Sequence, residues 1–551
     1  MKNLCIIPAR GGSKGIPRKN LRLLNGKPLI YYAINLSLNN KYVDEVVVST
    51  DDIEISNVAK KYGASIIPRE SNISTDNVTL DPVIYDAVNK QEEIGATKYD
   101  VVITVQPTSP LLKDETLSNA IETLIDNDYD TVMSVTDDRH LSWGIDSEGK
   151  FIPKYKERLN RQYLPKSYKE TGAILATKRE YVLENSRFGK NINLIEVDKK
   201  ESIDIDTYED WWIAERILKK KKIVIRVDAT NEIGTGHVYR QLYLASRIME
   251  HEVIFLMDNS KKLGVEIVEK NNYPIVKFDG ECLDELDKLK PDIVINDILD
   301  TTLEYMEYFK EKNIYSINFE DLGEGAKSAD IVFNALYDYK IPLKNIQMGY
   351  KYYVLRDEFK EFSTKEINEK VEKVLVTFGG TDPNNYTEKV IDLLIEGVND
   401  VKVDVVLGLG YKNKEYIKNK YESNGNINIV ESVTNISEYM YSSDIVITSG
   451  GRTMYEVASL GVPCMVLCQN ERELTHLFGH AGNGFLNLGL GTCLSDGIIK
   501  TNLLELINNY SLRSEMNRRM NRINLRNGFE NILHLVKEDY AKKYEVGKKV
   551  C

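Results

Sequence analysis

The sequence predicts an α/β protein built from three mostly parallel β-sheets that follow one another along the chain. From residue 3 to residue 215, short β-branched runs alternate with amphipathic segments, which is typical of strands covered by helices. The same alternation restarts at Ile223 and again at Val374. In addition, 551 residues are more than one hydrophobic core usually holds. We therefore expect three domains, at residues 1–220, 221–360 and 361–551.

The first expected domain begins with a short apolar strand and ends with an amphipathic helix. Four lysines, residues 219–222, follow that helix, where cations suit the carboxyl-terminal dipole. We interpret them as a solvated helix end, with nucleic-acid binding as the less favoured alternative. Strands are expected at Leu4–Pro8, Glu45–Ser49, Ala64–Ile67 and Val101–Val105, and helices at Leu29–Leu38 and Tyr208–Leu218.

The second half of the chain shows this organisation twice. A strand is expected at Ile223–Asp228, and a third sheet begins with Val374–Phe378. Between them, the polar run Arg356–Glu361 interrupts the apolar strands within a seam at residues 350–370. The pattern therefore predicts two similar α/β lobes that face each other across a cleft.

Charge and composition argue against several classes of function. A net charge of −12 disfavours nonspecific binding of nucleic acid. We find no apolar run near the ~20 residues that a membrane span needs, and the first strand is too short for a signal peptide. Cys464 and Cys468 on one expected strand would lie ~13 Å apart, too far to share a metal. We expect buried thiols in a reducing cytoplasm. The six cysteines are Cys5, Cys282, Cys464, Cys468, Cys493 and Cys551.

A basic glycine loop, residues 8–20, directly follows the first strand. Its glycines let the backbone approach phosphates closely, and successive N–H groups can hold an anion. The loop matches neither the P-loop nor the dinucleotide motif. A glycine-rich surface loop is the alternative, but ligands bind at the carboxyl ends of strands in such sheets. Four cations, enough to hold a triphosphate, belong to the loop: Arg10, Lys14, Arg18 and Lys19.

Two carboxylates near the end of the first domain form a candidate metal site. Asp204 and Asp206 are two residues apart on an expected strand, so both side chains point to one face. Paired hard oxygens suit Mg²⁺, which commonly uses one or two carboxylates together with substrate phosphates. The alternative is a solvated strand edge, or a helix N-cap at Asp206.

Four separated motifs follow one another in the first expected domain. They are Ile7–Asn20, Ser49-Thr50-Asp51, Gln106–Pro110 and Ile203–Thr207. Together they resemble the CMP-sialic acid synthetase family of cytidylyltransferases, which also make CMP-linked legionaminic and pseudaminic acids. The resemblance implies a Rossmann-like nucleotidyltransferase sheet, and a reaction in which the anomeric hydroxyl of a nonulosonic acid displaces pyrophosphate from CTP. It also implies a homodimer formed through this domain.

The same resemblance assigns roles to individual residues. Gln106 is expected to contact the sugar acid and Arg161 to face its carboxylate, although the region of Arg161 also resembles the dimer-forming segment. Asp204 and Asp206 would bind Mg²⁺. Gly15 is more typical of sialic and legionaminic acid synthetases than of pseudaminic ones. Arg10, Lys19 and Asp206 are the expected catalytic residues. The expected CTP-binding residues are Arg10, Gly11, Gly12, Ser13, Lys14, Lys19, Asn20, Arg69 and Thr79.

In the second half, a turn with Gly234 and Gly236 follows the strand at residue 223 and places His237 at a helix start. A neutral imidazole there can act as a general base, because the helix dipole lowers its proton affinity. By contrast, His476, His480 and His534 lie in helix-like stretches, for which packing or surface roles are expected.

Further glycine turns precede two expected helices of the last lobe, and such helix starts bind phosphate readily. Glu456 lies on the second of these helices and can bind a ribose diol, with an exposed helix carboxylate as the alternative. The expected nucleotide-sugar-binding residues of the second half are Gly234, Gly236, Gly379, Gly380, Gly450, Gly451, Arg452, Thr453, Glu456 and Asn470.

From Ile223 to about residue 530, the chain resembles the nucleotide-sugar hydrolase of pseudaminic acid synthesis and related spore-coat polysaccharide proteins. The resemblance implies a two-lobed glycosyltransferase-B-like fold and attack by water, deprotonated by His237, on a UDP-linked diacetamido sugar. One departure is Asn470-Glu471, where the family carries Asn-Gln. A glycosyltransferase and a non-catalytic nucleotide-sugar-binding module remain the alternatives. The matching segments are Arg226-Val227-Asp228, Ile233–Arg240, Leu355–Phe359, Phe378–Pro383 and Ser449–Thr453, with Glu456.

Overall fold

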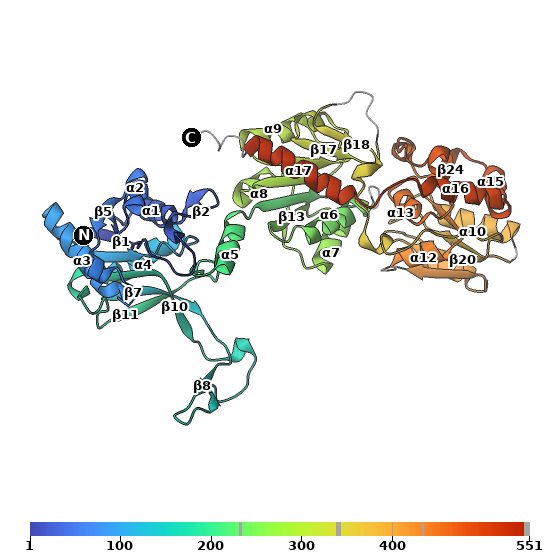
Figure 1. Ribbon diagram of the computed structural model, residues 1–551. Coiled ribbons are helices and arrows are strands. Elements are labelled where there is room, and N and C mark those ends of the chain that lie inside the picture. The colour runs from blue at the N-terminus through green and yellow to red at the C-terminus, as the bar shows by residue number, and fades with distance from the viewer. Residues whose placement is uncertain are drawn as a thin grey trace. The chain divides into compact units, whose positions relative to one another are not determined.

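The computed structural model describes the chain except residues 76, 231–233, 338–342, 399, 432, 434 and 545–551. Two residues quoted above, Ile233 and Cys551, therefore lie outside the described residues. The chain divides into two compact units, Met1–Lys220 and Lys221–Cys551, each with its own hydrophobic cores (Figure 1). The predicted α/β class, with mostly parallel sheets, is confirmed in both units.

Unit 1 is a sheet of strand order β11-β7-β10-β6-β1-β4-β5. The pairings are parallel except where β10 runs antiparallel to β6 and β7. The predicted elements are found within one or two residues. The strands are β1 (Asn3–Pro8), β4 (Glu45–Thr50), β5 (Ser65–Pro68), β6 (Val101–Val105), β7 (Thr131–Asp137), β10 (Tyr168–Lys178) and β11 (Ile192–Glu196). The helices are α1 (Leu29–Asn39), α2 (Ile53–Lys61), α3 (Leu80–Gly95), α4 (Asp114–Asp126) and α5 (Tyr208–Leu218).

The segment of the two candidate metal ligands is extended but is not a strand, which corrects the prediction. Residues 203–206 have no ladder partner, and Ile205 donates one backbone bond to Thr108. Ile205 is fully buried between the glycine loop and α5, beside Ile16 and Trp211. Packing of one side chain therefore holds this segment extended, without the hydrogen bonds of a sheet.

Two paired short strands, β8 (Trp143–Ile145) and β9 (Phe151–Pro153), form an arm that extends away from the sheet of unit 1 (Figure 1). Trp143, Ile145 and Phe151 are exposed on this arm. A second short pair, β2 (Leu23–Leu24) and β3 (Lys27–Pro28), lies between the glycine loop and α1.

The first lobe of unit 2 is a parallel sheet of order β14-β13-β12-β15-β16-β17-β18. Its strands are β12 (Lys222–Val227), β13 (Glu252–Asp258), β14 (Ile275–Phe278), β15 (Ile293–Asp297), β16 (Tyr315–Phe319), β17 (Ile331–Asn334) and β18 (Ile346–Met348). Its helices are α6 (Gly236–Arg247), α7 (Lys262–Lys270), α8 (Leu283–Leu289) and α9 (Leu303–Glu311).

The second lobe is a parallel sheet of order β21-β20-β19-β22-β23-β24. Its strands are β19 (Lys373–Val376), β20 (Lys402–Leu407), β21 (Ile427–Glu431), β22 (Ile445–Thr448), β23 (Cys464–Cys468) and β24 (Phe485–Leu490). Its helices are α10 (Tyr386–Gly397), α11 (Lys414–Tyr421), α12 (Ile436–Ser442), α13 (Thr453–Leu460), α14 (Glu471–Leu474), α15 (Asp496–Asn508) and α16 (Tyr510–Met520).

The last helix, α17 (Gly528–Tyr544), returns from the second lobe and lies on the first (Figure 1). Its Ile532 joins the core of the first lobe, and the Asp539 carboxylate accepts a 2.7 Å hydrogen bond from the Tyr315 hydroxyl. Because α17 follows the second lobe in the sequence but packs on the first, it connects the two lobes within unit 2. No helix among the described residues combines the length and apolar character needed to cross a bilayer.

Candidate active sites

A cavity of about 280 Å³ lies at the carboxyl ends of β1 and β6 in unit 1. Ligands bind at this edge of parallel sheets, and the predicted glycine loop forms one wall. Arg69 and Gln106, which lie far from the loop in the sequence, form other parts of the lining. The cavity thus brings together seven of the predicted site residues: Arg10, Gly12, Ser13, Lys19, Asn20, Arg69 and Gln106.

The glycine loop is held in place from two sides. On one side, the Gly11 N–H donates to the Asp51 carboxylate at 3.0 Å, and the Asn20 amide donates to the Arg10 carbonyl at 3.1 Å. On the other side, a Cβ added to Gly15 would lie only 2.3 Å from the Asp206 carbonyl oxygen. Glycine at position 15 therefore permits close packing of the loop on the acidic segment.

Arg69 is the most deeply buried cation of this cavity. Its guanidinium donates to the Ser49 carbonyl at 2.8 Å, and only 8% of the residue is exposed. Burial lowers the pKa of Arg69, and the positive charge of Arg10 acts in the same direction. Two cations held this close in a cavity are stabilised when an anion binds between them.

The acidic pair lies beside this cavity and is connected to it by Lys19. The Lys19 amine donates to the Asp206 carboxylate at 3.0 Å and to the Ile205 carbonyl at 2.5 Å. Both aspartates line a second cavity of about 520 Å³, which also contains Arg161. Burial raises the pKa of Asp204, and the negative charge of Asp206 adds to that effect. Lys19 thus stands between the two cavities.

A divalent cation fits the chemistry of this pair. Asp204 Oδ1 is buried and accepts no hydrogen bond from the described residues, so a carboxylate oxygen is left for a ligand. Asp206 is 73% exposed at its side chain and reachable by substrate. Among the described residues there is no cluster of three or more His, Cys, Asp or Glu side chains that could hold a metal. A cation here would need substrate phosphates to complete its coordination, which is common for Mg²⁺.

Other predicted residues of unit 1 lie outside the nucleotide cavity. Lys14 is exposed, and Arg18 donates to Glu54 at 2.5 Å. Thr79 is exposed at the start of α3 and is not part of the lining, whereas Thr75 and Val78 are.

In unit 2, His237 lies in the first turn of α6 and contacts the last residue of β15. His237 Nδ1 and Asp297 Oδ1 are 2.5 Å apart, and Asp297 is fully buried. Because an ionised carboxylate only accepts, Nδ1 carries the proton and Nε2 is left as the basic nitrogen. This is the relation between a general base and the acid that orients it.

Asp297 is held ionised by a network of donors. Arg240 donates to both of its oxygens, at 2.6 and 2.7 Å, and Gln241 donates at 2.7 Å. Burial acts to raise the pKa of Asp297, but the charge of Arg240 and the hydrogen bonds from Arg240 and His237 outweigh it and hold this pKa well below its usual range. Arg240 also donates to Glu320 at 3.0 Å. Sequence reasoning missed Asp297, although a polar residue that ends an apolar strand is a usable signal.

The two lobes of unit 2 approach each other at their glycine turns. A Cβ on Gly236 would lie 2.6 Å from Arg452 Cδ, and one on Gly380 would lie 2.5 Å from the Thr235 hydroxyl. Arg452 immediately precedes α13, and its Nη1 is buried with no partner among the described residues. Burial lowers the pKa of Arg452, and the charge of Arg240 adds to it. An unsatisfied cation at a helix start is suited to a phosphate.

The turn at Gly450 is occupied in part by a carboxylate of the chain. Glu473 accepts from the Gly450 N–H at 3.0 Å and from the Gln469 N–H at 2.7 Å. Asn470 is the N-cap of α14, since its side-chain oxygen accepts from the Glu473 N–H. Asn470 therefore has a structural contact, and the neighbouring Glu471 is exposed.

Two further expectations for this lobe turn out differently. Glu456 accepts from the Arg356 guanidinium at 3.0 Å, so it is neither an exposed carboxylate nor free of partners. His476 lies in a turn after α14 and is buried, so the expectation of a helix-like stretch was wrong for it. His480 is exposed at a short turn, and His534 is exposed on α17.

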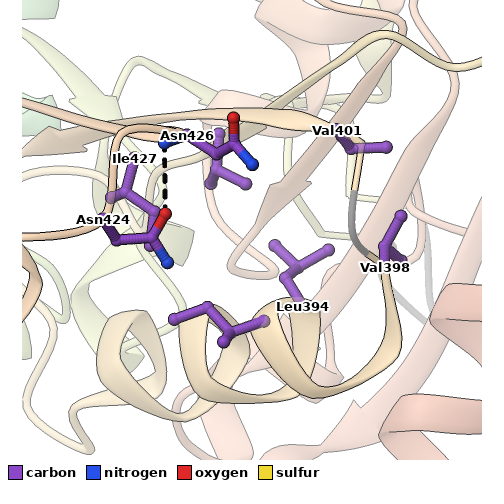
Figure 2. A pocket seen from close by; sticks show the side chains of 8 residues that line it. Leu394, Val398, Val401, Asn424, Asn426 and Ile427 are labelled. Atoms are coloured by element: carbon purple, nitrogen blue, oxygen red, sulfur yellow. Dashed lines mark hydrogen bonds between the residues drawn. The ribbon is translucent and has the colours of Figure 1, made fainter.

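A pocket of about 150 Å³, lined by aliphatic side chains together with Asn424 and Asn426, lies elsewhere in the second lobe (Figure 2). Leu394 and Val398 at the end of α10 face Val401 and Ile427, which lie at the amino ends of β20 and β21. The glycine turns lie at the opposite, carboxyl end of this sheet. The pocket therefore has no connection with the predicted nucleotide site.

Unit 1 has the sheet-edge anion cavity and neighbouring carboxylates of a nucleotidyltransferase, and unit 2 has the two parallel-sheet lobes of a nucleotide-sugar enzyme. Comparison with known proteins agrees with both classes. The cytidylyltransferase family model matches residues 4–196, and the model of the glycosyltransferase family 28 C-terminal domain matches residues 373–536. Pseudaminic acid cytidylyltransferase of Campylobacter jejuni is 35% identical over 229 residues, which are 40% of this chain and 97% of that protein. The chain belongs to the cytidylyltransferase family.

Two further relatives extend past the first unit. A Helicobacter pylori protein named pseudaminic acid cytidylyltransferase and UDP-2,4-diacetamido-2,4,6-trideoxy-β-L-altropyranose hydrolase is 26% identical over 490 residues. That match covers 85% of this chain and 88% of the H. pylori protein. An uncharacterized protein of Methanocaldococcus jannaschii is 33% identical over 276 residues, 46% of this chain and 56% of its own length.

Proposed function

We propose that the chain is a bifunctional enzyme of nonulosonic acid biosynthesis. Unit 1 transfers the cytidylyl group of CTP to a nonulosonic acid, and unit 2 hydrolyses a UDP-linked diacetamido sugar. The observation that carries this proposal is that each unit holds a separate, self-contained set of site residues. The H. pylori relative, matched over 85% of this chain, is named for the same two activities.

In unit 1, the cavity cations would hold and orient the triphosphate. Arg10 and Arg69 line this cavity and are proposed to contact the triphosphate, and Lys19 reaches the boundary with the second cavity. The anomeric oxygen of the sugar acid attacks the α-phosphorus, the bond to the β-phosphate oxygen breaks, and pyrophosphate leaves. Fixed cations stabilise the charge that develops on the phosphate oxygens.

Asp204 and Asp206 would hold a divalent cation, for which Mg²⁺ is our proposal. When bound, such a cation neutralises phosphate charge and polarises the oxygens of the reacting group. Lys19, which lines the nucleotide cavity, donates to Asp206 and so connects that cavity with the acidic pair. Gln106 and Arg161 line the two cavities on either side and are proposed to position the sugar acid.

In unit 2, His237 is proposed as the general base. Its Nε2 takes a proton from water, and the water oxygen attacks the anomeric carbon. The bond from that carbon to the phosphate oxygen breaks, and UDP leaves. Asp297 fixes the reactive tautomer and stabilises the imidazolium that forms. Arg452 is proposed to bind the diphosphate.

We also propose that unit 1 forms a homodimer through the arm of β8 and β9. Its exposed Trp143, Ile145 and Phe151 form the kind of apolar surface that marks an interface. The variant Phe151→Asp should shift the full chain from dimer to monomer in light scattering, whereas Ile94→Asp, at another exposed apolar residue of unit 1, should leave its mass unchanged. Because CTP is a cytoplasmic metabolite, we place both reactions in the cytoplasm.

Two variants of the full chain test the proposal. Asp206→Ala should abolish formation of the CMP-sugar and leave UDP release intact. His237→Ala should stop UDP release and leave cytidylyl transfer intact. Loss of both activities in either variant would contradict separate sites, and full cytidylyl transfer by Asp206→Ala would contradict the metal assignment.

The substrate of each unit can be identified with the same protein. A panel of sialic, legionaminic and pseudaminic acids with CTP shows which acid unit 1 prefers. UDP release measured with and without an added acceptor sugar distinguishes hydrolysis from glycosyl transfer. Binding of the UDP-sugar without turnover under either condition would mean that unit 2 is a non-catalytic module.

A further inference from the structure

A buried histidine of unit 2, His476, has no part in the chemistry proposed above. It lies in the turn after α14, and only 8% of it is exposed. His476 Nδ1 is 2.6 Å from the Gly450 carbonyl oxygen. Because a carbonyl oxygen only accepts, Nδ1 carries the proton and Nε2 is a hydrogen-bond acceptor.

The Nε2 atom of His476 is buried and has no hydrogen-bond partner among the described residues. The ring is fixed by the Gly450 bond and by Tyr337, which packs edge-on at 4.9 Å. Burial lowers the pKa of His476 to about 4, and the charges of Arg472 and Arg452 act in the same direction. The ring is therefore neutral near pH 7 and presents a fixed, unsatisfied acceptor.

The neighbours of His476 indicate which part of a ligand it faces. It is bonded to the Gly450 turn, next to Arg452, whose unpartnered Nη1 suits a diphosphate. Arg452 in turn lies against Gly236, the residue before the proposed base His237, because a Cβ added to Gly236 would be 2.6 Å from Arg452 Cδ. In a nucleotide sugar, the anomeric carbon joins the diphosphate to the sugar ring. A side chain close to the sites proposed for the diphosphate and the anomeric carbon is therefore placed to contact the sugar ring. The cations around His476 can bind anionic groups of a ligand. The neutral Nε2 of His476 can instead accept a hydrogen bond from a donor group of the ligand.

We infer that His476 Nε2 accepts a hydrogen bond from a hydroxyl or amide N–H of the sugar, and so makes unit 2 prefer the nucleotide sugar to UDP alone. This inference rests on the proposed function of unit 2. His476 is a specificity-determining residue in this account, and proton transfer remains with His237. A buried acceptor of this kind disfavours ligands that cannot supply its donor.

Two substitutions test the roles of the two ring nitrogens separately. His476→Asn can keep a donor near the Nδ1 position for the Gly450 carbonyl but loses the Nε2 acceptor. His476→Gln can place an amide near the Nε2 position but gives up the Gly450 bond. His534→Asn, at an exposed histidine of α17, is the matched control.

The experiment measures KM for a UDP-diacetamido sugar, the inhibition constant of UDP, and the melting temperature of the full chain. We expect His476→Asn to raise KM at least ~10-fold with little change in UDP inhibition or melting temperature. We expect His476→Gln to keep KM within ~3-fold while the melting temperature falls. An unchanged KM in His476→Asn, or equal losses for UDP and the sugar nucleotide, would overturn the inference.

A UDP-sugar that lacks one acetamido group then identifies the donor. If His476→Asn weakens binding of the diacetamido sugar alone, the donor is the amide; equal weakening of both sugars indicates a hydroxyl. The proposed function can fail separately. If the wild-type protein releases no UDP, hydrolysis is excluded, and equilibrium binding of UDP and of the UDP-sugar to wild type and His476→Asn still tests the inference.

Discussion

The two units hold their reactive groups in different ways. In unit 1, Asp204 Oδ1 has no hydrogen-bond partner among the described residues, and the Asp206 side chain is 73% exposed. In unit 2, the proposed base His237 is bonded to a fully buried carboxylate, which accepts three further bonds from Arg240 and Gln241. The two aspartates of unit 1 are therefore less fully hydrogen-bonded within the chain than Asp297 of unit 2.

This difference follows from the chemistry each unit is proposed to perform. A triphosphate brings its own charge, and a rigid set of paired cations would have to break those pairs before binding it. Water brings no charge, so its activation needs a base whose tautomer is fixed in advance. Substitutions should therefore lower the activity of unit 2 by disturbing the orientation of its base. In unit 1 they should lower activity by removing contacts to the ligand.

The largest expected effect comes from Asp297→Asn in unit 2. An amide can present the wrong partner to His237 Nδ1 and leaves Arg240 without its ionised acceptor. We expect UDP release to fall by about 10³–10⁴-fold, the scale seen when a catalytic histidine loses its orienting carboxylate. Cytidylyl transfer by the same protein is the internal control and should be unchanged.

Gln241→Met provides a milder comparison at the same carboxylate. It removes one neutral donor to Asp297 and keeps the volume of the side chain. UDP release should then fall by less than ~10-fold, because Arg240 still holds the carboxylate. A loss as large as that of Asp297→Asn would mean that packing, rather than orientation of the base, controls the rate.

Sequence reasoning identified His237, the proposed base of unit 2, but not its hydrogen-bond network. His237 was predicted from a glycine turn that follows a strand, and the structure finds it at the start of α6. Asp297 lies 60 positions away at the end of β15, so local patterns do not connect the two residues. His476 was expected to have a packing or surface role because its segment looks helical, whereas α14 ends at Leu474 and the chain turns.

The next largest effect is expected in unit 1, from Gly15→Ala. The added Cβ would lie 2.3 Å from the Asp206 carbonyl oxygen, so the glycine loop or the acidic segment must move. A displacement near 1 Å at a reacting group costs about 100-fold in rate, and we expect a loss of that size in cytidylyl transfer. Gly95→Ala, in ordinary contact distance only of Thr97, is the control.

The result also bears on the sugar acid. Gly15 was interpreted as a sign of sialic or legionaminic acid specificity, but its contact is with the backbone of Asp206. If Gly15→Ala lowers the rate equally for every nonulosonic acid tested, the residue packs the loop and carries no specificity. A change in the order of preferred acids would restore the first interpretation.

For unit 1, the sequence predicted most of the site because its residues belong to motifs at strand ends. Arg10, Arg69 and Gln106 follow β1, β5 and β6, and parallel strands bring their carboxyl ends together. The position of Thr79 outside the cavity lining could not be predicted from the sequence, because it depends on the path of the loop that precedes α3. The two aspartates share a face for a reason other than sheet pairing, namely the burial of Ile205 between them.

A smaller effect is expected on stability from Asp204→Asn. Because burial raises the pKa of Asp204, its ionised form destabilises unit 1 above that pKa, and the penalty disappears below the usual range of an aspartate. The variant should therefore melt higher than wild type at neutral pH and equally at low pH. Added Mg²⁺ with CTP should raise the melting temperature of wild type only, and equal shifts in both proteins would remove Asp204 from the cation site.

The smallest effect is a change in the pH dependence of unit 2. The pKa of His476 is about 4 in the folded chain and near 6.5 in the unfolded chain. Between these values the unfolded chain binds a proton that the folded chain does not, so the free energy of unfolding decreases as the pH falls from about 6.5 to about 4. The slope due to this one proton is at most about 1.4 kcal/mol per pH unit. In His476→Asn, this part of the slope should vanish from urea unfolding of the full chain, while His534→Asn keeps it. An unchanged slope in His476→Asn would mean that the ring takes up its proton in the folded state and is not the neutral acceptor that the inference requires.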